Sequence, residues 1–214
     1  MLPLEQIVPR GLSCLLGYVL GCFLTAELVA RKFAGKPASQ LGDTGNPGMA
    51  NIMASLGFKA GILTLLGDLI KVLVAAAVSY ALFHRTGWIV TLYAGLGCTL
   101  GHDFPFWRRF KGGKGVATSC LAVVIYNFPL GLLANILGML VVFATKYLCF
   151  GGPIIPLAFA VAMLAIREWE AAILGGILFL LALICHGPSI LGVFKGTTKP
   201  TDVLGAIFKK RKKK

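Results

Sequence analysis

The sequence predicts an all-α integral membrane protein, a bundle of about seven transmembrane helices with re-entrant or interfacial loop helices on the cytoplasmic side. Of its 214 residues, 57% are hydrophobic and only 14% are charged, whereas a typical soluble domain carries about 25% charged residues. The apolar runs approach or exceed the roughly 20 residues needed to cross a bilayer core. No apolar run is followed by a small-residue cleavage site, so we expect no removable signal peptide.

Seven apolar runs are expected to cross the membrane as helices. The third and fourth are short for full crossings, so we expect one of them to be tilted or partly re-entrant. The expected spans are Gly11–Val29, Ala60–Phe83, Gly87–Leu100, Val116–Asn127, Leu130–Leu148, Pro153–Ile166 and Ala171–Cys185.

The distribution of positive charge predicts the orientation of these spans. All but four of the 21 Lys and Arg residues lie in the first, third and fifth loops or in the C-terminal tail. The exceptions are Arg10, Arg85, Arg167 and, within a span, Lys71. Because cytoplasmic loops are enriched in Lys and Arg, we expect the N-terminus outside and the C-terminus in the cytoplasm.

We expect residues 1–198 to form a single polytopic domain, followed by a basic cytoplasmic tail over residues 199–214. The tail ends in KKRKKK, a run that favours contact with anionic lipid headgroups. Nucleic acid is not an expected partner, because no aromatic-interleaved basic surface accompanies the run. The six cysteines occur singly, so neither a metal site nor a disulfide framework is indicated.

A glycine-rich basic stretch precedes the fourth span. Lys111, Gly112, Gly113, Lys114 and Gly115 lead directly into the apolar segment VATSCLAVVIY. Glycines let the backbone fold closely around a ligand, and the start of a helix presents unpaired N–H groups and partial positive charge. Together with two lysines this predicts an anion cradle for a phosphate. The alternative is a flexible basic loop that only follows the charge rule of cytoplasmic loops.

A second possible anion site lies in the first cytoplasmic loop, over residues 42–57. Asn46 followed by Pro47 is typical of a helix N-cap with proline at the first helical position. We expect the helix to run to about Leu56 and to stop at Gly57. Two helix starts on one side of the membrane suggest two anionic ligands, or one ligand with two anionic groups, and so a reaction between two phosphate esters. The alternative is an interfacial helix that only covers the bundle.

Two charged residues and two histidines remain as candidates. Asp68 and Lys71 lie three residues apart in the second span, where they either neutralise each other as a buried pair or line a polar cavity. His102 ends the third span and His186 closes the seventh. Each is a candidate proton acceptor for a substrate hydroxyl or a structural hydrogen-bonding residue.

Several motifs resemble one known family. GHDFPFWRRFKGGKGVAT, residues 101–118, closely resembles the second signature, GHxFPxFxxFKGGKGVAT, of the bacterial integral-membrane acyltransferases that acylate glycerol 3-phosphate from acyl phosphate, the PlsY family. GNPGMAN, residues 45–51, resembles the core of the first signature, GNxGAxN. GDLIK resembles an intramembrane LDxxK element at Asp68 and Lys71. HGPSILGVFKGT, residues 186–197, resembles the third signature, HxxNIxRLxxGTE.

Other positions depart from the family pattern. GCFL replaces GSIP at residues 21–24, and DTGN replaces GSGN at residues 43–46, without the usual preceding arginine. In the third signature Ser189 replaces Asn, Gly192 replaces Arg and Thr198 replaces Glu. The lost arginine and asparagine are strong donors to phosphate or carbonyl groups, and Asp43 would repel a phosphate unless a cation offsets it.

The resemblance implies transfer of a fatty acyl group from acyl phosphate to the 1-hydroxyl of sn-glycerol 3-phosphate, with no metal or cofactor, in the bacterial inner membrane. Acyl phosphate, glycerol 3-phosphate and membrane lipid are the expected partners. The catalytic candidates are His186, His102 and Lys114. The substrate-binding candidates are Lys111, Gly112, Gly113, Gly115, Thr118, Thr44, Asn46, Gly48, Asn51, Lys71 and Ser189.

Two other functions stay open on the sequence alone. A phosphate-ester or anion transporter could use the same cradle, although the chain shows no inverted repeat and no matching pair of interrupted helices. A family member with altered or lost catalysis would also retain the cradle. The sequence does not indicate the acyl-chain preference or the oligomeric state.

Overall fold

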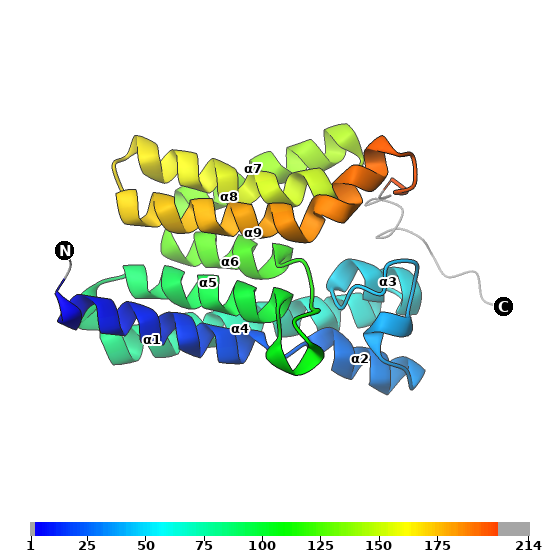
Figure 1. The fold of residues 1–214 in the computed structure, drawn as a ribbon, viewed down its shortest axis with the longest axis horizontal. Helices are drawn as coiled ribbons and strands as arrows, with labels where there is room; N and C mark the ends of the chain where they lie inside the picture. Colours follow the sequence, from blue (N-terminus) through cyan, green and yellow to red (C-terminus); the bar gives the residue numbers. More distant parts are fainter. Residues whose placement is uncertain (1–2, 201–214) are drawn as a thin grey trace.

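The computed structural model describes residues 3–200 as a helical bundle. Its helices lie side by side along one axis, and no strand occurs within this range (Figure 1). The α-helices are α1 (Leu4–Gly21), α2 (Thr25–Ala34), α3 (Met49–Leu56), α4 (Phe58–Phe83), α5 (Ile89–Asp103), α6 (Val116–Tyr126), α7 (Phe128–Thr145), α8 (Leu148–Ala165) and α9 (Trp169–Phe194). Short 3₁₀ turns are η1 (Ala38–Gln40), η2 (His84–Thr86) and η3 (Phe106–Arg108).

The bundle confirms the fold class: α4 to α9 correspond to the last six expected spans, and α1 overlaps the first one in part. By length and composition, five segments can cross a membrane: Leu4–Ala34, Phe58–Thr86, Phe128–Thr145, Leu148–Ala165 and Trp169–Phe194. The two short spans are α5, with 15 residues, and α6, with 11. At about 1.5 Å per residue, α6 covers about 16 Å, roughly half of a bilayer core.

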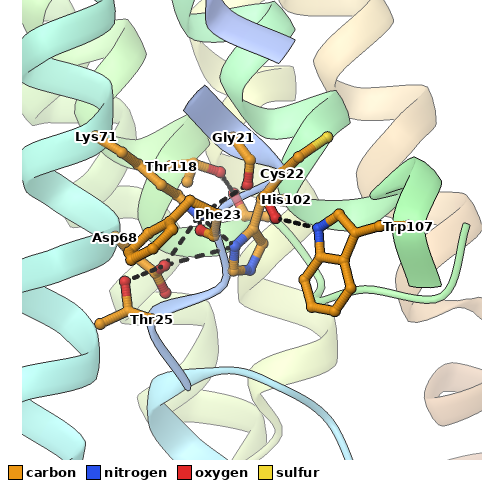
Figure 2. Close-up of polar contacts among 10 residues, drawn as sticks. Gly21, Cys22, Phe23, Thr25, Asp68, Lys71, His102, Trp107 and Thr118 are labelled. Atoms are coloured by element: carbon orange, nitrogen blue, oxygen red, sulfur yellow. Dashed lines mark hydrogen bonds and ion pairs between the residues drawn. The ribbon is translucent and has the colours of Figure 1, made fainter. Parts of the chain in front are cut away.

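The first expected span, Gly11–Val29, is wrong as one continuous helix. Helical structure ends at Gly21 and restarts at Thr25 as α2, after Leu24 in an extended conformation. The freed carbonyls accept hydrogen bonds from distant side chains: Lys71 Nζ donates to Gly21 and Phe23, and Trp107 Nε1 donates to Cys22 (Figure 2). A break inside the bundle is tolerated because side-chain donors from other elements satisfy its backbone carbonyls.

The last span extends further than expected. α9 continues past Cys185, through Pro188, to Phe194, because the apolar run resumes after the proline. His186 and Ser189 therefore both lie on α9. Their positions along the helical turn determine which neighbouring helix or loop each side chain faces.

Close helix contacts fix the arrangement of the bundle. A Cβ at Gly17 would overlap the carbonyl of Ala94, and one at Gly97 would overlap that of Cys14, so α1 and α5 pack backbone to backbone. At the far end of the bundle, the Glu170 carboxylate accepts bonds from Arg10 Nη2 at 3.0 Å and from the Tyr93 hydroxyl at 3.0 Å. These bonds join α1, α5 and α9.

The loops expected on the cytoplasmic side gather at one end of the bundle. Figure 1 shows α2, α3, the loop before α6 and the C-terminal end of α9 at this end. The N-terminal end of α1 lies at the opposite end. Of the expected tail, residues 201–214 lie outside the described part of the chain.

Candidate active site

The glycine-rich stretch forms a fixed turn at the start of α6. Gly115 has φ +65° and is the N-cap of the helix that begins at Val116, as predicted. The N–H groups of Gly112 and Gly113 donate to the carbonyls of Asp103 and His102, each at 2.9 Å. These two N–H groups are therefore not open to a ligand, which corrects that part of the predicted cradle.

The donors that remain lie one residue further along. Within residues 3–200, the N–H groups of Lys114, Gly115 and Val116 have no hydrogen-bonded acceptor. They form the start of α6, where unpaired N–H groups and the helix dipole favour an anion. The predicted cradle is thus narrowed to residues 114–116 and the first turn of the helix.

The loop before the glycines is held against α2 and the helix break. Arg108 Nη1 lies 3.0 Å from Glu27 Oε1, an ion pair whose angles fall outside hydrogen-bonding geometry. Trp107 donates to the Cys22 carbonyl at 2.8 Å. Arg109 and Phe110 both have positive φ, 54° and 60°, a conformation that costs energy for non-glycine residues.

Lys114 extends from the glycine turn toward α9. Its Nζ donates to Ser189 Oγ at 2.6 Å. Partial burial lowers the pKa of Lys114 from its ordinary value, because desolvation disfavours the ammonium form. An anion beside this ammonium would offset that desolvation.

The first loop differs in part from the prediction. α3 begins at Met49 with Gly48 as its N-cap, so the expected cap at Asn46 with Pro47 at the first helical position is wrong. Its end at Leu56 and the stop at Gly57, with φ +91°, are confirmed. The reason is that residues 44–48 form a separate turn, in which the Gly48 N–H donates to the Asn46 carbonyl at 2.9 Å.

That turn is stabilised by side-chain hydrogen bonds. Thr44 Oγ1 donates to Asn51 Oδ1 at 3.2 Å and accepts from the Asn46 N–H at 3.3 Å. Asn51 Nδ2 donates to the Leu41 carbonyl at 2.9 Å. Asn51 therefore orients Thr44 instead of facing open space.

A cavity of about 460 Å³ lies between the first loop, α9 and the loop that joins α5 to α6, residues 104–115, which we call the glycine loop. We term this cavity the loop pocket. Its lining includes the cations Arg108, Lys111 and Lys114 and no carboxylate. The residues that line it are Ser39, Thr44, Gly45, Asn46, Pro47, Arg108, Lys111, Gly112, Lys114, Cys185, Pro188 and Ser189. The structure thus joins segments far apart in sequence into one cationic site.

Six predicted site residues line the loop pocket, and eight do not. The six are Thr44, Asn46, Lys111, Gly112, Lys114 and Ser189. The eight are His102, His186, Lys71, Gly113, Gly115, Thr118, Gly48 and Asn51. The buried side chains among them do not reach the cavity in this conformation. Gly115 still carries one of the N–H groups at the start of α6 that have no acceptor in the described part of the chain.

The two histidines are buried. His102 is 5% exposed and contacts Lys71, and His186 is 2% exposed with its Nδ1 2.9 Å from the Ala182 carbonyl of its own helix. The His186 ring packs beside Gly152 of α8. A catalytic role for either remains a prediction.

Sequence reasoning missed two of the polar lining residues. The charge pattern marks Arg108 only as one of the cytoplasmic cations, although it lies inside the second signature. Ser39 gives no signal in the sequence, because its place depends on how the first loop folds.

The charge of Asp43, next to the pocket-lining Thr44, is offset by Lys199. Lys199 Nζ lies 2.8 Å from Asp43 Oδ2, and both side chains are exposed. The hydrogen bond and the charge of Lys199 lower the pKa of Asp43. The cation that the sequence left unidentified thus comes from beyond the end of α9.

Comparison with protein families gives one match across most of the chain. Residues 11–196 match the family model described as glycerol-3-phosphate acyltransferase. The chain is 38% identical to glycerol-3-phosphate acyltransferase 1 of Lactobacillus johnsonii over 92% of this chain and 95% of the relative. It is 35% identical to glycerol-3-phosphate acyltransferase of Pseudomonas putida over 86% and 96% of the two chains.

The fold also resembles a solved membrane protein. The glycerol 3-phosphate form of PlsY (YgiH), an integral membrane glycerol 3-phosphate acyltransferase, superposes with a TM-score of 0.79 at 23% identity, over 93% of this chain and 98% of that one. Its lysophosphatidic acid form gives a TM-score of 0.77 at 22% identity. At these identities the likeness concerns the fold.

Proposed function

The chain belongs to the glycerol-3-phosphate acyltransferase family, and on that premise we propose that it transfers a fatty acyl group from acyl phosphate to the 1-hydroxyl of sn-glycerol 3-phosphate. The products are lysophosphatidic acid and inorganic phosphate, in phospholipid biosynthesis. The observation that carries the proposal is the loop pocket, because three cations and no carboxylate line it. Such a cavity suits phosphate groups.

The proposal also specifies acyl phosphate as the acyl donor. Acyl phosphate is already activated, so the enzyme needs no nucleophilic residue to form a covalent intermediate. The requirement is to place the two substrates together and to stabilise charge on the departing phosphate. Lys111 and Lys114 supply that stabilisation in the same cavity that holds the phosphate of glycerol 3-phosphate. Arg108 also lines this cavity, paired with Glu27.

The reaction consists of one displacement at the acyl carbonyl carbon. The 1-hydroxyl oxygen bonds to that carbon, and the carbon–oxygen bond to phosphate breaks with its electron pair leaving on the phosphate. Neither a histidine nor a carboxylate is among the residues that line the pocket. The departing phosphate therefore takes the hydroxyl proton, and Thr44, Asn46 and Ser189 orient the polar groups.

The protein acts in the inner membrane of a bacterium as a multi-pass protein, with its N-terminus outside and the loop pocket on the cytoplasmic side. The gathering of cationic loops at the pocket end of the bundle supports this orientation. Water-soluble glycerol 3-phosphate would then enter from the cytoplasm, while the acyl chain remains along the apolar helices.

A product assay tests the proposal. Purified protein in lipid receives glycerol 3-phosphate with either a long-chain acyl phosphate or acyl-CoA, and lysophosphatidic acid is followed by mass spectrometry. We expect product only with acyl phosphate. Product from acyl-CoA would overturn acyl phosphate as the acyl donor. A folded protein that makes no product but takes up phosphate ester into vesicles would favour the transporter. No relative reported above supports that alternative.

A further inference from the structure

A buried polar cluster lies behind the loop pocket, at the break between α1 and α2. The Lys71 ammonium lies 3.0 Å from Asp68 Oδ1 and 2.8 Å from His102 Nδ1. It also donates to the carbonyls of Gly21 at 3.3 Å and Phe23 at 3.1 Å. Figure 2 shows these groups converging on Lys71 from α4, α5 and the break. None of them lines the loop pocket.

The surroundings of Lys71 determine the protonation of His102. A carboxylate and two carbonyls can only accept hydrogen bonds, so they stabilise the charged ammonium of Lys71. An ammonium has no lone pair, so His102 Nδ1 must accept its proton. The His102 ring is therefore neutral and carries its own proton on Nε2.

The opposite edge of the ring supports the glycine turn. A Cβ at Gly113 would overlap His102 Nε2, so the ring packs directly on the Gly113 backbone. The His102 carbonyl also accepts the Gly113 N–H at 2.9 Å. His102 thus holds Gly113 by its ring and by its main chain, and Lys114 follows at the next position.

The same break also holds the loop before the glycines. Trp107 Nε1 donates to the Cys22 carbonyl, between the two carbonyls that Lys71 occupies. Both ends of the glycine loop thus depend on the geometry of residues 21–23 (Figure 2). Loss of Lys71 would free two carbonyls of the break and the Nδ1 of His102 together.

We propose that Lys71 is a positioning residue for the loop pocket. It holds His102 as the neutral Nε2–H tautomer and fixes the helix break, so that the glycine turn places Lys114 against the phosphate. The proposal deepens the acyltransferase function and rests on it for the identity of the phosphate ester.

The test compares wild type with Asp68→Asn/Lys71→Met, which removes the buried charges together because removing one alone leaves the other unpaired. Selective ¹⁵N-histidine NMR, with His102→Gln to assign the signal, reports the tautomer. The affinity for inorganic phosphate and the KM and kcat/KM for glycerol 3-phosphate show whether the loop pocket still binds phosphate groups. Ser79→Ala, which removes a buried hydroxyl from the same helix without a hydrogen-bond partner, is the matched control.

We expect the Nε2–H tautomer in wild type and in Ser79→Ala, and its loss in the double variant. The double variant should also lower kcat/KM for glycerol 3-phosphate by up to about 100-fold, the loss of rate that a small misplacement can cause. An Nδ1–H or charged His102 in wild type would overturn the proposal. A changed tautomer with unchanged phosphate binding would also overturn it.

Lys71→Arg is the second variant if the double variant does not fold. It keeps a donor and a positive charge, so it should retain the Nε2–H tautomer and show a smaller fall in kcat/KM. Loss of the tautomer in Lys71→Arg with wild-type phosphate binding would contradict the positioning role. A wild-type protein that binds phosphate with the expected tautomer but makes no lysophosphatidic acid would refute the proposed function and leave this inference standing.

Discussion

The ammonium of Lys114 lies 2.6 Å from the hydroxyl of Ser189, and this bond joins the glycine loop to α9 across the loop pocket. Both residues line the cavity, together with Arg108 and Lys111. The donor side of an anion site is therefore assembled before a ligand arrives, and preorganised donors stabilise developing charge most effectively. The following expectations depend on this arrangement.

Replacement of Lys114 by alanine should weaken phosphate binding. A hydrogen bond to a charged group contributes about 1.5–3 kcal/mol, so KM for both phosphate substrates should rise about 10- to 100-fold. Steady-state kinetics in lipid vesicles measure the change. Lys36→Ala removes an exposed cation of the first loop outside the pocket and should remain near wild type. Near-normal activity of Lys114→Ala at low substrate would show that Lys114 does not hold the phosphate.

The alkaline limb of the pH profile should depend on the same residue. Burial lowers the pKa of Lys114, so its charge is lost at a lower pH than that of an exposed lysine. Because kcat/KM reports ionisations of the free enzyme, its value should fall as pH rises through this lowered pKa. Lys114→Arg keeps its charge, so its alkaline limb should move to higher pH. Identical alkaline limbs in both proteins would exclude Lys114 as the titrating group.

A methyl group at Gly113 should disrupt the glycine turn. The new Cβ would overlap the His102 ring, which is buried and cannot move freely. Overpacking of this kind costs about 1–3 kcal/mol, so Gly113→Ala should lower both kcat/KM and thermal stability. Gly176→Ala on α9 is the control, since a Cβ there meets nothing within 4 Å. Equal behaviour of the two variants would contradict the described packing.

The offset of Asp43 by Lys199 gives a salt-dependent prediction. Lys199→Ala should weaken phosphate binding at low salt, because it leaves Asp43 uncompensated next to the loop pocket. Asp43→Asn/Lys199→Ala should restore binding, and high salt should abolish the difference because exposed charges are screened. Phosphate titrations of wild type and both variants at two ionic strengths measure these differences in affinity. Wild-type binding by Lys199→Ala at low salt would contradict this role.

Local signals explain the parts of the fold that the sequence predicts well. Gly115 followed by an apolar run without Pro or Gly predicts the start of α6 at Val116, as found. The break after Gly21 could not be predicted, because the donors that satisfy it, Lys71 and Trp107, come from other elements. The sequence likewise predicts that the last span ends at Cys185, although the helix continues through Pro188 to Phe194.

The sequence also predicts some features of the functional site and not others. Charge and glycine patterns identify Lys111 and Lys114 as pocket residues. They do not show that His102 and His186 are buried behind the lining, because burial depends on neighbours from α4 and α8. A histidine at a helix end resembles a catalytic residue in sequence, and only the packing distinguishes a supporting residue from one that touches substrate.

The central claim is that the loop pocket binds the phosphate of the acyl acceptor. A structure of the protein with sn-glycerol 3-phosphate tests it most directly. We predict phosphate oxygens at about 2.7–3.1 Å from Lys114 Nζ and from N–H groups at the start of α6, with the Lys114–Ser189 bond lengthened or replaced. A phosphate located away from residues 108–116 and α9, with Lys114 still bonded to Ser189, would contradict the account.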